Sequence, residues 1–61
     1  MKIQVGDILK HRRSGSLFLV LEHFKTINTY LIRTQNEGMY RAGLETRFTY
    51  EFLRDTCYKV A

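Results

Sequence analysis

The chain has 61 residues, with ten Lys or Arg and six Asp or Glu, and therefore a net charge of +4. This length excludes a second domain or a linker, because a chain of this size buries only about 60% of the surface that its unfolded form exposes. The single cysteine, Cys57, excludes an intrachain disulfide and a zinc cluster. Stability is therefore expected to come from packing or self-association.

The first seven residues place a polar or charged side chain at every second or third position. This pattern differs from the apolar segment of a secretory signal. The sequence therefore predicts a cytoplasmic protein in which Cys57 is reduced. No amphipathic helix of useful length can be drawn, so membrane attachment is not expected.

The N-terminal part of the chain is predicted to be extended. Residues 2–5 are expected to form a first strand, which Gly6 and Asp7 end with a turn. A second extended segment is predicted for residues 8–12. A hairpin loop over residues 13–16 follows it, with Gly15 as the residue expected to have a positive φ.

Five consecutive apolar residues follow this loop, Leu17-Phe18-Leu19-Val20-Leu21. The run is too short for a membrane span, which needs about 20 apolar residues. It is also too short and too sharply bounded for a buried helix. We therefore expect a central strand that is buried on both faces.

The next strand is predicted at residues 29–34, which are rich in β-branched and aromatic side chains. Residues 24–28 are expected to be a loop whose Phe24 and Ile27 fold back over one edge of the sheet. Residues 35–38 have the composition of a second hairpin turn.

The C-terminal part is predicted to return through residues 39–49, with a bulge or kink at Gly43. Thr49 is a suitable N-cap, and the apolar pair Phe52-Leu53 favours a single helical turn after it. Residues 57–61 alternate again and are expected to form a short final strand.

These elements predict an all-β fold. No helix is long enough to cover a sheet, so closure of the sheet on itself is the expected way to bury both faces. We predict a small five-stranded antiparallel barrel, formed by residues 1–61 as a single domain, with one helical turn before the last strand.

Several residues give the chain a family resemblance: Val5-Gly6-Asp7, Leu9, Ser14-Gly15, Phe18 and Val20. With the helical turn before the last strand, this pattern resembles the SH3-like barrels, and among them the small basic modules of the KOW and Tudor type. The resemblance covers nearly the whole chain and implies the fold. For nucleic-acid binders of this kind, it also implies contacts from loops and the adjacent sheet surface.

The densest positive cluster is His11-Arg12-Arg13, at the mouth of the first hairpin. Arginine side chains there could bind phosphates in a bidentate manner, and Lys10 is expected to share a strand face with Arg12. The alternative is that these are ordinary edge-strand and turn charges, which discourage aggregation between strands.

Further candidates depend on which side of the sheet they occupy. Lys25, Arg33, Arg41 and Arg47 would extend the site if they lie on the same side. Tyr40 is expected to be exposed and to stack on unpaired bases, whereas Phe18, Phe48 and Phe52 are expected in the core. The predicted nucleic-acid-binding residues are Lys10, Arg12, Arg13, Arg33, Tyr40, Arg41 and Arg47.

Catalysis is not expected. His11 and His23 lack an accompanying nucleophile and carboxylate, Cys57 is expected to be inert, and there is no glycine-rich phosphate loop. We predict no catalytic residue, metal ligand or cofactor. An enzyme would require a symmetric oligomer, because one short chain does not enclose a substrate pocket.

The favoured hypothesis is a non-enzymatic protein that binds DNA or RNA through phosphate contacts, with little sequence specificity. The alternative is a protein-interaction module that regulates a larger host or phage enzyme through its basic loop or an edge strand. A homo-oligomer also remains open.

The two hypotheses differ in where charge should lie. Nucleic-acid binding predicts that Arg12 and Arg13 converge, away from acidic residues, with at least two of Arg33, Arg41 and Arg47. The protein-interaction hypothesis tolerates acidic residues there and requires an exposed apolar patch or an open edge.

Overall fold

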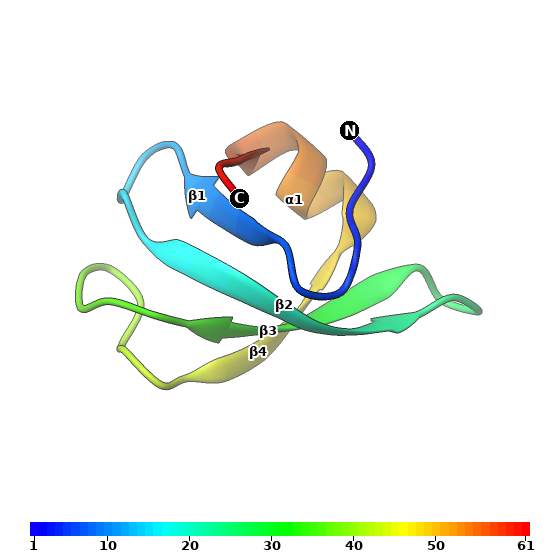
Figure 1. Ribbon diagram of the computed structural model, residues 1–61, viewed down its shortest axis with the longest axis horizontal. Helices are drawn as coiled ribbons and strands as arrows, with labels where there is room; N and C mark the ends of the chain where they lie inside the picture. The colour runs from blue at the N-terminus through cyan, green and yellow to red at the C-terminus, as the bar shows by residue number, and fades with distance from the viewer.

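The computed structural model describes residues 1–61 and contains five β-strands and one α-helix, most of which are labelled in Figure 1. In chain order the elements are β1 (Ile8–His11), β2 (Leu17–Phe24), β3 (Thr29–Thr34), β4 (Glu45–Thr49), α1 (Tyr50–Thr56) and β5 (Cys57–Lys59). The predicted order, with five antiparallel strands and a short helix before the last one, is confirmed. No helix has the length and apolar composition needed to cross a membrane.

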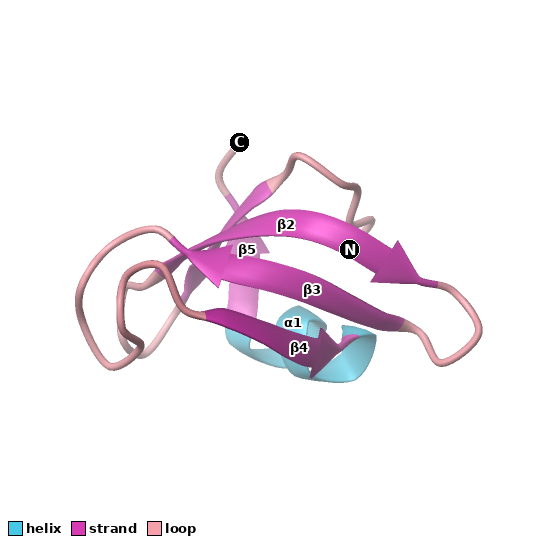
Figure 2. Ribbon diagram, turned by 90° about the horizontal axis from the view of Figure 1, so that it is seen from below, coloured by secondary structure: helices cyan, strands magenta, loops and turns pink.

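The strands form one antiparallel sheet in the order β4-β3-β2-β1-β5. β1 pairs with β2 through Leu9 and Phe18, and β2 pairs with β3 through Val20 and Ile32. This pairing leaves β4 and β5 as the two edge strands, so the hydrogen bonds do not include closure into a barrel. Figure 2 shows α1 on one side of the curved sheet, next to β4 and β5.

The core lies on the inner face of the sheet. It consists of the buried apolar residues Ile3, Leu9, Phe18, Val20, Tyr30, Ile32, Leu53 and Cys57. Alternation along β2 puts Phe18 and Val20 inward, whereas Leu17, Leu19 and Leu21 are only half-buried on the outer face. The expectation that this strand is buried on both faces is therefore wrong. Only its inner face is fully buried.

The N-terminal segment is not a strand. Residues 2–5 have no regular structure, although Ile3 is buried in the core. Gly6 has a φ of 95°, and its N–H donates to the carbonyl of Val20 at 2.9 Å. This turn and the Tyr50 hydroxyl, which donates to the Met1 carbonyl at 2.7 Å, hold the segment in place without strand pairing.

The β3–β4 connection is longer than predicted. Residues 35–44 form a loop, and β4 begins only at Glu45. Gly43 has a φ of 85°, and its N–H donates to the carbonyl of Thr34 at 2.7 Å. This left-handed residue redirects the chain into β4, so residues 39–42 do not reach the ladder.

Strand β2 also extends further than expected. It runs to Phe24, with a register shift between Val20 and Glu22. Ile27, predicted to fold over the sheet edge, is exposed.

Helix α1 has two turns instead of one. The Thr49 side chain accepts a hydrogen bond from the Phe52 N–H at 3.1 Å, which confirms the predicted N-cap. Leu53 is the buried residue of the helix, whereas Phe52 is half-buried. Phe48 is also half-buried, so of the three phenylalanines expected in the core only Phe18 is fully enclosed.

Candidate functional site: a groove beside the first hairpin

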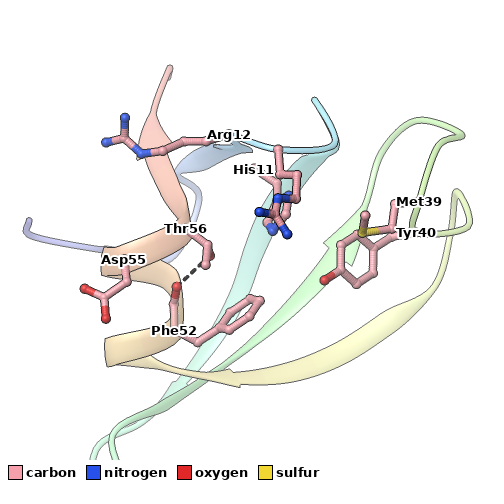
Figure 3. A pocket seen from close by; sticks show the side chains of 8 residues that line it. His11, Arg12, Met39, Tyr40, Phe52, Asp55 and Thr56 are labelled. Atoms are coloured by element: carbon pink, nitrogen blue, oxygen red, sulfur yellow. Dashed lines mark hydrogen bonds between the residues drawn. The ribbon is translucent and has the colours of Figure 1, made fainter.

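The structure has one pocket, a groove of about 460 Å³ between the β1–β2 loop, the β3–β4 loop and α1 (Figure 3). Its lining residues are His11, Arg12, Arg13, Met39, Tyr40, Phe52, Asp55 and Thr56. Arg12, Arg13 and Tyr40 were predicted from the sequence as binding residues, and all three contribute to this lining, although the Arg12 side chain points away from Tyr40 (Figure 3).

The β1–β2 hairpin carries both arginines in the loop that forms the rim of the groove. Gly15, with a φ of 76° as expected, donates its N–H to the His11 carbonyl at 2.8 Å, and the His11 N–H donates to the Ser16 carbonyl at 2.8 Å. The Arg12 N–H donates to the carbonyl of Thr56 at 2.8 Å. The hairpin is thereby fixed to the end of α1, the other wall of the groove.

His11 lies at the floor of the groove and is only 5% exposed. Its Nδ1 atom accepts the backbone N–H of Ser14 at 3.2 Å and lies 2.9 Å from the Ser14 hydroxyl. A backbone N–H can only donate, so Nδ1 carries the lone pair. The proton of the neutral ring is therefore on Nε2.

Aromatic rings surround this imidazole. Figure 3 shows His11 between Phe52, which comes from α1, and Tyr40, which comes from the β3–β4 loop. The ring centroids are 6.2 Å apart for His11 and Phe52, in a stacked arrangement, and 5.5 Å apart for His11 and Tyr40, edge to face. Phe18 and Phe48 extend the cluster into the core.

Tyr40 is half-buried and packs against this cluster. Its ring is 5.3 Å from that of Phe18 and 5.9 Å from that of Phe48, both edge to face. The expectation of an exposed platform is therefore wrong, because the long loop folds Tyr40 back onto the core. Part of the ring still lines the groove.

Three ion pairs use six of the charged residues: Arg33–Glu45, Arg54–Asp55 and Lys59–Asp7. Arg12 and Arg13 form none. The Arg12 guanidinium lies over the exposed ring of Tyr58, 5.4 Å from its centroid. Neither arginine is therefore paired with a carboxylate of the chain, and the Arg12 guanidinium points away from the aromatic part of the groove (Figure 3).

Asp55, the acidic residue of the groove, is bound by its own neighbour. The Arg54 guanidinium donates to both carboxylate oxygens, at 2.9 and 3.3 Å. These hydrogen bonds lower the pKa of the Asp55 carboxyl below its ordinary value. In Figure 3 the carboxylate points away from Tyr40 and His11, so it lies at one end of the groove.

The other predicted arginines lie elsewhere. Arg33 donates to Glu45 Oε2 from Nε at 3.2 Å and from Nη2 at 2.9 Å. The Arg47 guanidinium lies over the ring of Phe24, 4.5 Å from its centroid. We call Phe24, Arg33, Glu45 and Arg47 the outer patch, because they lie on the face of the sheet opposite the core.

Two predicted residues flank the groove without lining it. Lys10 pairs with Leu17 and Tyr58 across the ladder and points to the outer face. Because Arg12 lies over Tyr58, it shares this face, as expected from strand alternation. Arg41 is exposed in the β3–β4 loop next to Tyr40.

Sequence reasoning missed the groove residues that belong to other elements, namely Met39, Phe52, Asp55 and Thr56. It also considered His11 as part of a positive cluster and as a catalytic histidine, and did not predict that it is buried at the floor of the groove. The signal was present, because His11 is two residues after Leu9 in β1, and side chains two positions apart in a strand point to the same face, here the core.

Two further features bear on metal binding and on the reactivity of the thiol. No three His, Cys, Asp or Glu residues lie close enough to hold a metal ion. Cys57 is buried, and this burial raises the pKa of its thiol. A thiol with a raised pKa is a poor nucleophile near neutral pH.

Comparison with known proteins found no matching family model, no matching curated protein and no matching solved structure.

Proposed function

We propose that this protein is a non-enzymatic nucleic-acid-binding module whose first hairpin contacts phosphates with little sequence specificity. The observation that carries the proposal is the groove, whose lining includes Arg12, Arg13 and Tyr40 and in which neither arginine has a carboxylate partner. Free guanidinium groups are strong bidentate ligands for phosphate.

The fold supports this proposal. We propose an SH3-like barrel, in which the curved sheet and α1 enclose one small core. The strand order and the helix before β5 support this arrangement. Such a module would present its hairpin loops at one end, where they can follow a nucleic-acid backbone.

The net charge of +4 favours association with a polyanion. The site is smaller than the sequence indicated, because Arg33 is paired with Glu45 and both Arg33 and Arg47 belong to the outer patch. We therefore propose about two phosphate contacts in the groove. Binding that depends on phosphates fixes position and does not read sequence.

A second candidate is the protein-interaction module, with an acidic partner surface on the regulated enzyme. Met39 and Leu44, in the loop beside the groove, are 64% and 43% exposed. The edges of β4 and β5 are unpaired, and Asp55 lies among the groove residues. A partner could add a strand at an edge while its carboxylates contact Arg12 and Arg13.

Titration of the purified protein against labelled single- and double-stranded DNA and RNA tests the first candidate. Two phosphate contacts should cost about tenfold in affinity when salt rises from about 50 to about 200 mM. Salt-sensitive binding supports the nucleic-acid proposal. No binding even at low salt contradicts it and favours the protein-interaction candidate.

Charge reversal locates the site. The double variant Arg12→Glu, Arg13→Glu should lose about tenfold or more in affinity for all sequences alike. The matched control is Lys25→Glu, Arg47→Glu, which changes the net charge equally but leaves the groove intact. Equal losses in both variants would mean that binding is diffuse and does not use the groove.

A further inference from the structure

We infer that the groove holds one unpaired base of a single strand, with the Nε2–H of His11 donating a hydrogen bond to the acceptor edge of that base. This inference rests on the proposed nucleic-acid function and adds the form of the ligand. It starts from a buried polar group whose hydrogen bonding within the chain is incomplete.

His11 is only 5% exposed as a residue, and its imidazole is bonded on one side only. Nδ1 is occupied by Ser14, whereas Nε2 has no hydrogen-bond partner in the chain. The only fully buried side-chain polar atoms without a partner are the hydroxyl oxygens of Thr29 and Thr34. Nε2 therefore keeps contact with solvent, and His11 meets solvent at the groove.

The walls next to this donor are flat and apolar. Tyr40 lies on one side of His11 and Phe52 on the other, and the exposed Met39 side chain extends the wall at Tyr40 (Figure 3). Aromatic side chains bind the faces of bases, and each stacked base contributes about 1–3 kcal/mol. A base inside a duplex exposes neither face, so the ligand must be unpaired.

The size and charge of the groove also fit one nucleotide. A volume of about 460 Å³ lies within the range of small-molecule sites. Arg12 and Arg13 follow His11 in the hairpin at the rim of the groove and have no carboxylate partners, and the Arg12 guanidinium lies over Tyr58 on the outer side. The phosphates that flank the base would therefore lie along this hairpin. An acidic peptide would satisfy the arginines, but the donor and the two ring walls match a planar ligand better.

Oligonucleotides without bases test the inference directly. We would compare a short single strand, a strand of equal length built from abasic sugar phosphates, and the corresponding duplex, all at low salt. The wild-type protein should bind the intact strand about tenfold more tightly than the abasic strand, which carries the same phosphates. The duplex should resemble the abasic strand.

The outcomes separate the inference from the proposed function. Equal affinity for intact and abasic strands overturns the base site but leaves phosphate binding in place. Failure to bind any of the three ligands overturns both. Arg12→Glu with Arg13→Glu should weaken intact and abasic strands alike.

His11→Phe then tests the hydrogen bond, because it keeps a ring and removes Nε2–H. The intact strand should lose about three- to tenfold in affinity, as expected for one hydrogen bond, while the abasic strand is unaffected. Nitrogen NMR of the wild-type imidazole gives an independent readout that does not depend on this variant folding. An unprotonated Nε2 at neutral pH would overturn the assigned donor.

Discussion

The groove and the outer patch contain nearly the same chemical groups but differ in which arginines are paired with a carboxylate. Each has two arginines, a carboxylate and at least one aromatic ring. In the outer patch, Glu45 binds Arg33 through two hydrogen bonds and Arg47 covers Phe24. In the groove, Arg54 binds the carboxylate of Asp55, and the two arginines of the hairpin remain without an acidic partner.

This difference shows that residue type alone does not make a binding site. A guanidinium that already has a carboxylate partner must lose that interaction before it binds phosphate. The chain neutralises Arg33 internally but leaves Arg12 and Arg13 available. The following variants change the two regions in parallel, beginning with the largest expected effect.

The aromatic rings of the two regions should contribute differently to stability. Phe52 stacks on Phe48, with centroids 4.4 Å apart, whereas Phe24 has the Arg47 guanidinium over its ring and lies outside the core cluster. Phe52→Ala should lower the free energy of unfolding by about 2–3 kcal/mol, and Phe24→Ala by about 1 kcal/mol, because neither ring is fully buried. Urea denaturation measures both. Equal losses of unfolding free energy would mean that Phe24 contributes as much to packing as Phe52 does.

A carboxylate placed in the groove should make it resemble the outer patch. Met39 lines the groove and is 64% exposed, so Met39→Glu should change stability by less than about 0.5 kcal/mol. The new carboxylate should compete with phosphate for Arg13 and lower the affinity for a single strand about tenfold at low salt.

Leu44→Glu is the control for this variant. It adds the same charge to the same loop, at a residue that does not line the groove. Its effect should be about twofold, since only long-range repulsion acts there. An equal loss in both variants would show that net charge, and not the groove, determines affinity.

Local chemistry explains why parts of the fold were predictable from the sequence. β3 lies where it was expected because its β-branched and aromatic residues all favour a strand. The turn glycine Gly15 and the cap Thr49 each depend on their immediate neighbours in the chain. Elements with such local signals were located to within a residue or two.

The rest depends on contacts between distant residues. The loop over residues 35–44 follows from the pairing of Thr34 with Gly43 and from the packing of Tyr40 on Phe18, neither of which has a local pattern. Likewise, the Arg33–Glu45 pair spans 12 positions and exists only through the β3–β4 register. Strand alternation gives the face of an arginine but does not identify its partner.

Removal of the carboxylate that pairs with Arg33 should make this arginine available for phosphate binding in the outer patch. Glu45→Gln removes its partner, so the affinity for nucleic acid should rise about two- to threefold at low salt. Both side chains are nearly half exposed, so the loss of stability should not exceed about 0.5 kcal/mol. Glu51→Gln is the matched control, because Glu51 is exposed in α1 and belongs to none of the three ion pairs. An equal gain in this control would contradict a specific release of Arg33.

The smallest expected effect concerns the arginine that binds the Asp55 carboxylate. Measuring the free energy of unfolding as a function of acidic pH can identify this arginine. The lowered pKa of Asp55 arises mainly from its hydrogen bonds with Arg54. Because the ionised carboxylate is favoured in the folded protein, its contribution is complete above the ordinary pKa of 3.8. It is lost as pH falls through the lower folded value.

Asp55→Asn should therefore flatten the decline of unfolding free energy between about pH 5 and about pH 2, and Arg54→Gln should reproduce much of that change. Arg13→Gln should leave the decline as it is in the wild type. Asp7→Asn provides a reference, since the Gln4 N–H bonds Asp7 at 2.7 Å and lowers its pKa independently of the groove. If Arg13→Gln flattened the pH dependence as Arg54→Gln does, the Asp55 carboxylate would interact with an arginine of the first hairpin. The groove would then be neutralised internally in the same way as the outer patch.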